Sequence, residues 1–418
     1  MYMSRTIIEK IFAAHSEDEA APGKVIWLEL DVRTARDFAG ANVVKRFREA
    51  YPGERVADPK KTFFTFDCNA PANTIAYAQN QQVCRVFARE QGIKVYDVDS
   101  GIGSHVLMEE GLAFPGATVV GTDSHLNILG AVGAFGQGMG DVDIAFAFRY
   151  GRTWFEVPYT MKVVVRGHYE YPVTAKDLTL FLVGKLGARG ALGKAVEIYG
   201  DQVEALDMAG RITLCSMATE MGAIGAFLPP SEHLWAFVEE ATGRRDFPYP
   251  TADPDAEYIR ELEFDVSGLK PLIAAPPRPD NVYEVSELEG ERVDTVFVGS
   301  CTNGRYEDIR LLAEILKGRK VARGVILKVA PATRRVWGRL LKEGWLEVLY
   351  DAGAIITHPA CAGCAQGQIG MTGEGEVQLS TGNRNFPGKQ GKGPTYLCSP
   401  ATAAASALFG KITSPERL

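Results

Sequence analysis

Three cysteines near the C-terminal end have the residue type and the spacing to hold a metal. Cys301 follows the apolar run Thr295-Val-Phe-Val-Gly, and Cys361 and Cys364 form a C-x-x-C pair in a loop that contains glycine. A structural zinc site needs four closed ligands, and a four-iron cluster that only transfers electrons has four thiolates. Three thiolates leave one metal position open to a substrate. The same residues are also compatible with ordinary buried thiols, a redox dithiol or half of a zinc site.

The residues around Cys301 predict a strand followed by a helix. The run before it is rich in β-branched residues, and from about Arg305 apolar residues recur at helical spacing until Gly318, which we expect to end the helix. Cys301 would then lie at the carboxyl end of a strand. Open α/β sheets bind their ligands at that edge.

Four segments carry a resemblance to a known family. They are Gly-Ser-Cys-Thr-Asn-Gly at 299–304, Cys-Ala-Gly-Cys at 361–364, Ser-Thr-Gly-Asn-Arg-Asn-Phe at 380–386 and Cys-Ser-Pro-Ala-Thr-Ala-Ala-Ala at 398–405. Together they resemble the aconitase superfamily, in which three cysteines hold a [4Fe-4S] cluster whose fourth iron binds the hydroxyl and a carboxylate of the substrate. The resemblance implies that Cys301, Cys361 and Cys364 are these ligands.

The resemblance covers nearly the whole chain, but 418 residues are too few for aconitase itself. The length is similar to that of the separate large subunit of the isopropylmalate dehydratase and homoaconitase group. The resemblance implies an α/β fold. It also implies an aconitase-type assembly of three domains around a central cluster cleft, without the swivelling fourth domain. A small subunit would supply that domain, with the catalytic serine and the loop that reads the substrate. We expect the domains at 1–159, 160–275 and 276–418, with a proline-rich linker at 274–280.

The composition narrows the class of protein further. Hydrophobic residues make up 46% of the chain and charged residues 23%, as in a soluble globular protein, and the net charge of −7 argues against nucleic acid as the main partner. We find no run of eighteen apolar residues and no signal-peptide core. Seven scattered cysteines suit a reducing compartment better than a disulfide framework, so we expect a cytoplasmic protein.

Asp67 and Cys68 follow a predicted strand and form the first candidate site outside the cysteines. The family usually carries Asp-His here, and its histidine protonates the leaving hydroxyl. A cysteine with an ordinary pKa is mostly a neutral thiol at pH 7 and donates a proton only weakly. Three interpretations stay open: another group takes over the role of the acid, the substrate differs, or activity is reduced or lost.

Gly-Thr-Asp-Ser-His at 121–125 is among the most specific signatures of the family. By resemblance, Asp123 accepts a hydrogen bond from the ring of His105, and His125 pairs with Glu197. A carboxylate on one ring nitrogen orients an imidazole and leaves the other nitrogen to hold a proton or a substrate oxygen. The predicted catalytic set is Asp67, His105, Asp123, His125 and Glu197.

The resemblance also implies residues that bind the substrate. Arg384 either binds a carboxylate or braces its loop. Aconitases place carboxylate-binding arginines on the helix that follows Lys328-Val-Ala-Pro-Ala-Thr; here Trp337 and Lys342 take those places, and the choice among the neighbouring arginines 334, 335 and 339 stays open. The predicted substrate-binding set is Ser124, Asn303, Arg384 and Cys68.

These expectations describe a hydro-lyase that dehydrates and rehydrates a 2-hydroxy di- or tricarboxylate of the 3-isopropylmalate or homoaconitate type. A related hydratase for another malate derivative, such as dimethylmalate or citramalate, is an alternative. A non-catalytic iron-sulfur regulator or subunit is another. A zinc-binding module would require a fourth ligand such as His358.

Overall fold

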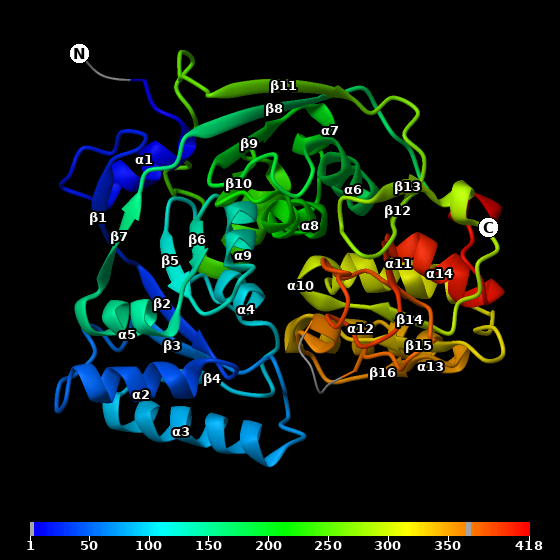
Figure 1. Cartoon of the computed structure of the whole chain (residues 1–418), viewed down its shortest axis with the longest axis horizontal. Coiled ribbons are helices and arrows are strands. Elements are labelled where there is room, and N and C mark those ends of the chain that lie inside the picture. Colours follow the sequence, from blue (N-terminus) through cyan, green and yellow to red (C-terminus); the bar gives the residue numbers. More distant parts are fainter. Residues whose placement is uncertain (1–3, 365–368) are drawn as a thin grey trace.

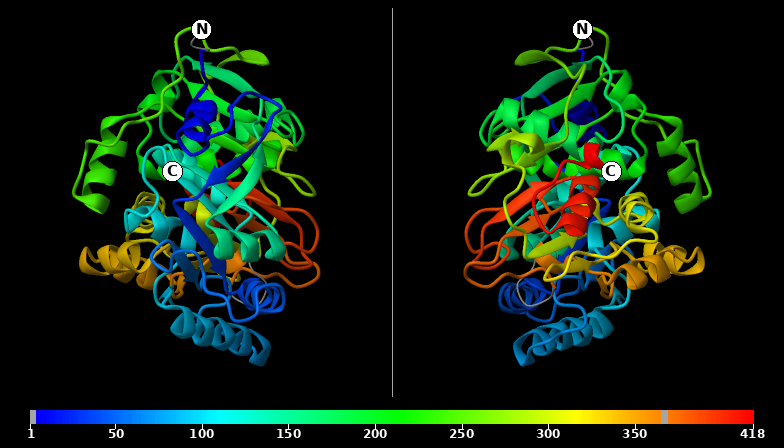
Figure 2. Two further views of the ribbon diagram at one scale, coloured as in Figure 1. Left: turned by 90° about the vertical axis from the view of Figure 1, so that its left-hand side faces the viewer. Right: turned by 90° about the vertical axis from the view of Figure 1, so that its right-hand side faces the viewer.

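The computed structural model describes residues 4–364 and 369–418, and for Cys364 it describes the backbone alone. The described chain forms three mainly parallel sheets with helices packed against them and one two-stranded ribbon (Figures 1 and 2). The predicted α/β class is confirmed. No helix in the described part is both long enough and apolar enough to cross a membrane.

The first sheet has five parallel strands in the order β4-β3-β2-β5-β6. Strands β3 and β5 are buried along their whole length, because helices and loops cover both faces of the sheet. Strands β1 and β7 of this part of the chain pair with each other as a separate antiparallel ribbon. The elements are α1 (Ile7–Ala14), β1 (Val25–Glu29), β2 (Val32–Arg36), α2 (Gly40–Ala50), β3 (Thr62–Thr65), α3 (Ile75–Gln91), β4 (Lys94–Tyr96), α4 (Gly103–Glu109), β5 (Thr118–Gly121), η1 (Leu126–Val132), β6 (Phe135–Gly138), α5 (Asp141–Tyr150) and β7 (Arg152–Glu156).

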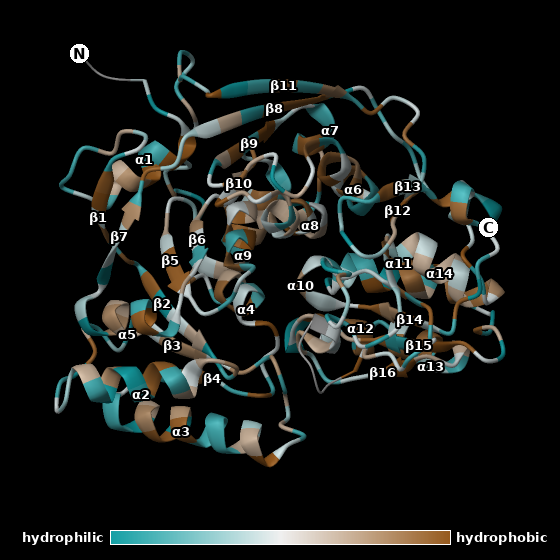
Figure 3. Cartoon of the chain, viewed as in Figure 1, coloured by the Kyte–Doolittle hydropathy of each residue, from teal (hydrophilic) through white to brown (hydrophobic). Residues whose placement is uncertain are grey.

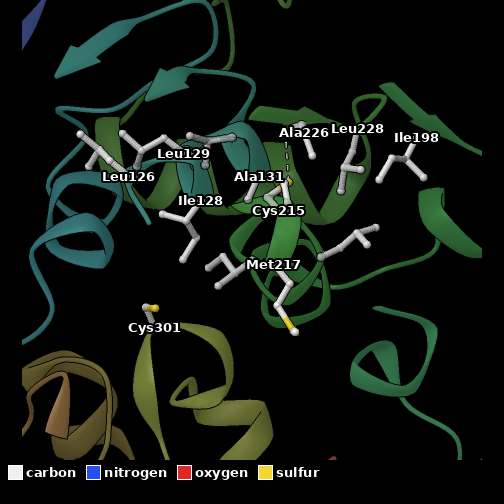
Figure 4. Close-up of a cluster of buried hydrophobic side chains, with 14 of the residues drawn as sticks. Leu126, Ile128, Leu129, Ala131, Ile198, Cys215, Met217, Ala226, Leu228 and Cys301 are labelled. Carbon is white, nitrogen blue, oxygen red and sulfur yellow. Dashed lines mark hydrogen bonds between the residues drawn. The ribbon is translucent and has the colours of Figure 1, made fainter. Parts of the chain in front are cut away.

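The second sheet has four parallel strands in the order β10-β9-β8-β11. Its helix α8 packs against η1 of the first part, and Leu129 and Met217 belong to the apolar core that joins them (Figure 4). Cys215 lies in this core and its thiol donates to the Ala226 carbonyl at 3.5 Å, so it serves packing. The elements are β8 (Thr160–Arg166), α6 (Ala175–Leu186), β9 (Ala195–Tyr199), α7 (Asp201–Glu204), α8 (Met208–Ser216), η2 (Met217–Met221), β10 (Gly225–Phe227), α9 (Glu232–Thr242) and β11 (Arg260–Asp265).

The third sheet has seven strands in the order β13-β12-β18-β17-β14-β15-β16. The predicted strand and helix around Cys301 are confirmed as β14 and α11, with the short helix α10 between them. The elements are β12 (Leu272–Ala274), β13 (Val282–Glu284), η3 (Val285–Leu288), β14 (Thr295–Val298), α10 (Ser300–Asn303), α11 (Tyr306–Leu316), β15 (Ile326–Val329), α12 (Arg334–Lys342), α13 (Trp345–Ala352), β16 (Ile355–Ile356), η4 (Ala362–Cys364), β17 (Gln378–Ser380), β18 (Thr395–Cys398), α14 (Pro400–Phe409) and η5 (Pro415–Arg417).

The division into three domains stays a prediction, although each sheet falls largely within one of the expected ranges. Strand β12 already pairs with β18 and so joins the third sheet just before residue 276. Apolar residues follow the buried strands, whereas β11 is largely polar and exposed (Figure 3).

Backbone hydrogen bonds fix the first part of the chain against the third. The amide of Ile102 donates to the Ala332 carbonyl at 2.8 Å, and the amide of Cys361 donates to the Asp67 carbonyl at 2.9 Å. Two loops that are remote in sequence are thereby held together. The candidate site lies at this junction.

Candidate active site

Two of the predicted cluster ligands each lie beside a residue with left-handed backbone geometry. Ser300 has φ 75° and Ala362 has φ 48°, and in the described part of the chain they are the only residues other than glycine with positive φ. Each such residue costs about 1–3 kcal/mol, and strain of this kind clusters at functional sites. Gly299 precedes Ser300 with φ 153°, and a Cβ there would meet the Ala330 carbonyl oxygen at 2.6 Å. The backbone around Cys301 and Cys361 is therefore held in a costly shape that the surrounding structure maintains.

Both cysteines line a pocket of about 600 Å³. The loops after strands β2, β3, β5 and β14 contribute to its wall, so the site lies at the carboxyl ends of strands, as predicted. The predicted residues that line it are Cys68, Asp123, Ser124, His125, Cys301 and Cys361. The side chain of Cys364 lies outside the described residues, so its role as third ligand stays a prediction.

His125 pairs with Glu220, and the predicted pairing with Glu197 is wrong. Nε2 of His125 lies 3.1 Å from Oε1 of Glu220, which also accepts from Nε of Arg384 at 2.9 Å. Burial alone would raise the pKa of Glu220, but the charges and hydrogen bonds of His125 and Arg384 lower it. Glu220 is therefore an ionised carboxylate that orients the imidazole. One signal was present in the sequence, because Glu220 is the only charged residue in 212–226.

Glu197 instead fastens the N-terminal helix to the second sheet. It lies on β9 and accepts hydrogen bonds from the amide of Ile7 at 2.7 Å, from Tyr199 Oη at 2.5 Å and from Tyr258 Oη at 2.7 Å. The Ile7 amide is the first of helix α1, which has no partner within the helix. Glu197 is buried with these donors and does not line the pocket.

His105 holds the Cys301 loop, and its predicted hydrogen bond to Asp123 is absent from the described contacts. Nε2 of His105 donates to the Cys301 carbonyl at 2.9 Å, whereas Nδ1 is buried and has no hydrogen-bond partner among the described residues. Burial, followed by the charge of Arg305, lowers the pKa of His105 to about 3. The ring is therefore neutral. Oδ1 of Asp123 instead accepts from the Arg36 guanidinium and from the His125 amide.

Arg36, at the end of β2, is the main site residue that the sequence analysis missed. Its Nε donates to Asp67 Oδ1 at 2.7 Å, its Nη1 to Asp123 Oδ1 at 3.0 Å and its Nη2 to Cys361 Sγ at 2.9 Å. Asp67 also accepts from the Gly103 amide at 2.7 Å. Burial raises the pKa of Asp67 to about 6 despite the nearby arginine. The missed signal was positional, since Arg36 ends the strand that pairs with β3 and β5, and Asp67 and Asp123 follow the ends of those two strands by two residues.

Cys68 keeps its proton in this environment. Its thiol donates to Asp67 Oδ1 at 3.5 Å, and burial raises its pKa well above the usual range. Its amide and those of its two neighbours donate to the Asp37 carboxylate, which fixes the loop. Tyr77, from the first turn of α3, lines the same pocket. Burial, with the nearby Cys68, raises the pKa of Tyr77 to about 12.

The predicted substrate-binding residues separate into two groups. Ser124 lines the pocket and its Oγ accepts from Nη1 of Arg384 at 3.3 Å, so Arg384 both braces Glu220 and reaches the pocket wall. Asn303 is buried and does not line this pocket, and its Nδ2 donates to Thr213 Oγ1 at 3.0 Å and to Asp308 Oδ1 at 2.9 Å.

The arginines of α12 pair with surface carboxylates and do not line the pocket. Arg334 pairs with Asp99, Arg335 with Glu240 at 3.5 Å and Arg339 with Glu343 at 2.9 Å. His358, the possible fourth zinc ligand, is exposed and its Nε2 bonds to the Val98 carbonyl at 2.7 Å. The basic residues that line the pocket are Arg36 and Lys389.

Comparison with known proteins places this site in a family. The sequence profile of the Aconitase family (aconitate hydratase) matches residues 9–410. The chain therefore belongs to the aconitase family, as its segments around the cysteines predicted.

Within the family, the similarity extends over the full length of large subunits. The chain is 44% identical to "3-isopropylmalate dehydratase large subunit 1" of Archaeoglobus fulgidus, with 100% of both chains covered. It is 42% identical to the "Probable methanogen homoaconitase large subunit" of Methanothermobacter thermautotrophicus, covering 98% of this chain and 97% of that protein. Among solved structures, the holo-form of Thermococcus kodakaraensis aconitase X is 13% identical with a TM-score of 0.49, covering 92% of this chain and 93% of that one.

Proposed function

We propose that the chain is the cluster-bearing large subunit of a hydro-lyase that dehydrates and rehydrates a 2-hydroxy di- or tricarboxylate of the 3-isopropylmalate or homoaconitate type. The observation that carries this proposal is the convergence of Cys301, Cys361, Asp123, Ser124 and His125 on one pocket. The similarity to large subunits of both enzymes supports the substrate class.

The described residues fit an iron-sulfur cluster. Thiolates that bind iron are stabilised by N–H donors, and here Asn383 Nδ2 lies 3.2 Å from Cys301 Sγ while Arg36 donates to Cys361 Sγ. We expect Cys301, Cys361 and Cys364 to hold a [4Fe-4S] cluster with one iron open. When bound, the cluster supplies a Lewis acid that polarises the hydroxyl of the substrate.

The chain's own residues would orient the substrate and handle protons. Arg384 and Lys389 supply positive charge near the pocket for the carboxylates of the substrate. Glu220 accepts from Nε2 of His125, which leaves Nδ1, 3.5 Å from Ser124 Oγ, to exchange a proton with a substrate oxygen or water. Asp123 Oδ2 and Glu220 Oε2 are buried acceptors without a hydrogen-bond partner among the described residues. Such acceptors fit the hydroxyl group of a bound ligand.

We further propose that the chain needs a small subunit, which supplies the serine base and the loop that reads the substrate. The relatives' names, which call them large subunits, support this requirement. We also propose a cytoplasmic location. The six cysteines whose side chains are described are all buried and form no disulfide with one another, which agrees with a reducing compartment.

The direct test is a hydration assay of anaerobically purified protein with and without its small subunit. Isopropylmalate, homoaconitate, citraconate and dimethylmalate should be compared as substrates. We expect the chain together with its small subunit to turn over one of these compounds, and the chain without the small subunit to turn over none. A cluster-loaded pair that turns over none of them would reject the proposal.

The neutral thiol at Cys68 favours two other candidate functions, because that thiol is a poor acid. One is a non-catalytic iron-sulfur regulator or subunit. The other is a hydratase for another malate derivative. A protein with full cluster content and no turnover in the presence of its partner would support the non-catalytic candidate. Turnover of dimethylmalate or citraconate alone would support the other.

A further inference from the structure

We propose that Arg36 is a positioning residue that holds the Cys361 thiolate by an N–H···S hydrogen bond and links it to the carboxylates of Asp67 and Asp123. On this proposal, Arg36 sets the reduction potential of the cluster and slows its loss. The inference rests on the proposed function, because it requires that Cys361 be a cluster ligand.

The geometry of Arg36 supports this role directly. Its three guanidinium nitrogens each donate to a different acceptor, at 2.7 Å to Asp67, at 3.0 Å to Asp123 and at 2.9 Å to the sulfur of Cys361. The acceptors lie at three separate places in the sequence. A guanidinium is planar and stays charged, so three such bonds fix its orientation as well as its position.

Arg36 compensates the negative charge of two carboxylates that are almost fully buried. Its side chain is 13% exposed, and those of Asp67 and Asp123 are 0% and 5% exposed. Within the described part of the chain, Arg36 is the only basic side chain within ion-pair distance of either carboxylate. Without it, two buried carboxylates would stand beside a thiolate with no basic side chain of the described residues at ion-pair distance.

Cys361 is tied to the Asp67 loop in a second way. Its amide donates to the Asp67 carbonyl at 2.9 Å, while Arg36 joins its sulfur to the Asp67 carboxylate. The Cys68 thiol donates to the same Oδ1 of Asp67. Arg36 is thus the charged group that connects the Cys361 sulfur to this loop.

The consequence for a bound cluster follows from general electrostatics. A positive charge and an N–H donor at a ligand sulfur stabilise the reduced, more negative state of a cluster and so raise its potential. Because Arg36 is fixed by its bonds to Asp67 and Asp123, its bond to Cys361 also holds that sulfur in one position, which favours retention of the cluster. Arg36 should therefore raise the reduction potential and prolong retention of the cluster.

The test compares Arg36→Lys and Arg36→Gln with the wild-type protein and with Arg33→Lys. Arg33 is a matched control because it is a buried arginine of the same strand, and it donates to two carbonyls and to Thr62 without contact to a cysteine. Each protein is reconstituted anaerobically, and its midpoint potential is measured by redox titration followed by electron paramagnetic resonance. Loss of visible absorbance in air gives the rate of cluster loss, and circular dichroism checks the fold.

We expect Arg36→Gln to shift the potential to a more negative value and to lose its cluster about 10-fold faster or more. Arg36→Lys, which keeps the charge but not the fork, should fall between Arg36→Gln and wild type. Arg33→Lys should match wild type. If Arg36→Gln does not fold, the comparison of Arg36→Lys with Arg33→Lys decides.

Wild-type potential and retention in the Arg36 variants would overturn the inference while leaving the proposed function intact. Equal shifts in Arg33→Lys would also overturn it, because they would show a general effect of disturbing the strand. A wild-type protein that takes up no cluster would contradict both proposals.

Discussion

At the scale of single residues, the site depends on which carboxylate faces which imidazole. Glu197 and Glu220 both lie in apolar segments, yet only Glu220 reaches His125. The difference comes from tertiary packing, because His125 and Glu220 are 95 positions apart. Sequence reasoning found the histidine and the need for an acidic partner, but it could not choose between two acidic residues on elements whose relative placement was unknown.

The pair Glu220→Gln and Glu197→Gln separates these roles. Glu220→Gln should lower kcat about 100-fold, because the imidazole loses the carboxylate that orients it. Glu197→Gln should leave kcat nearly unchanged and lower the free energy of unfolding by about 1–3 kcal/mol, because the buried donors around Glu197 lose a charged acceptor. Steady-state kinetics with the small subunit and thermal unfolding provide the two measurements. The reverse pattern would restore Glu197 to the active site.

Cys68→His tests the interpretation of position 68 as a modified acid site. The native thiol holds its proton too tightly to act as an acid near neutral pH, whereas an imidazole donates more readily. We expect kcat to rise or the preferred substrate to change in the assay with the small subunit. If neither happens, that interpretation is wrong, and Tyr77, which carries a hydroxyl and lines the same pocket, becomes the residue to test.

At the scale of elements, strands and their ends could be predicted, whereas contacts between distant elements could not. The strand before Cys301 and the helix that begins near Arg305 follow from local periodicity, and both are confirmed. The link from Arg36 to Cys361 spans 325 positions and leaves no local pattern in the sequence. Contacts of this kind decide the chemistry of the site.

Helix α6 provides a pH-dependent test at this scale. Asp177 closes the capping box of α6 and accepts from the Leu272 amide of β12 at 2.8 Å, so it joins the second and third sheets. Burial raises its pKa from 3.8 to about 6. The folded protein therefore binds an extra proton between about pH 4 and 6, and this contribution to stability is present below pH 4 and is lost as the pH rises through 6.

Asp177→Asn should remove that contribution. Denaturant unfolding at pH 4.5 and pH 8 should show a smaller difference in the free energy of unfolding for the variant than for wild type, by about 2 kcal/mol. Asp280→Asn, in the linker after β12, serves as a control that should keep the wild-type difference. An unchanged pH dependence in Asp177→Asn would show that the carboxyl ionises normally in the folded protein.

At the scale of the whole molecule, the pocket is a surface that we expect a second chain to complete. Phe38 and Phe386 line it and remain 67% and 48% exposed. Exposed aromatic residues at a functional pocket are typical of a binding interface.

Phe38→Ser should weaken binding of the small subunit about 10-fold, measured by calorimetry, without changing the iron content. Tyr350→Ser, at an exposed residue of α13 that does not line the pocket, is the control. Equal binding by Phe38→Ser and wild type would exclude Phe38 from the interface.

The measurement that tests the central claim most directly is iron and sulfide analysis of anaerobically purified protein, with single serine variants of the cysteines. We predict about four iron and four sulfide per chain in the wild type, and loss of the cluster in Cys301→Ser, Cys361→Ser and Cys364→Ser. Cys215→Ser, in the apolar core, should retain it. A wild-type chain that binds a single zinc ion or no metal, or a cluster that survives all three ligand substitutions, would contradict the claim.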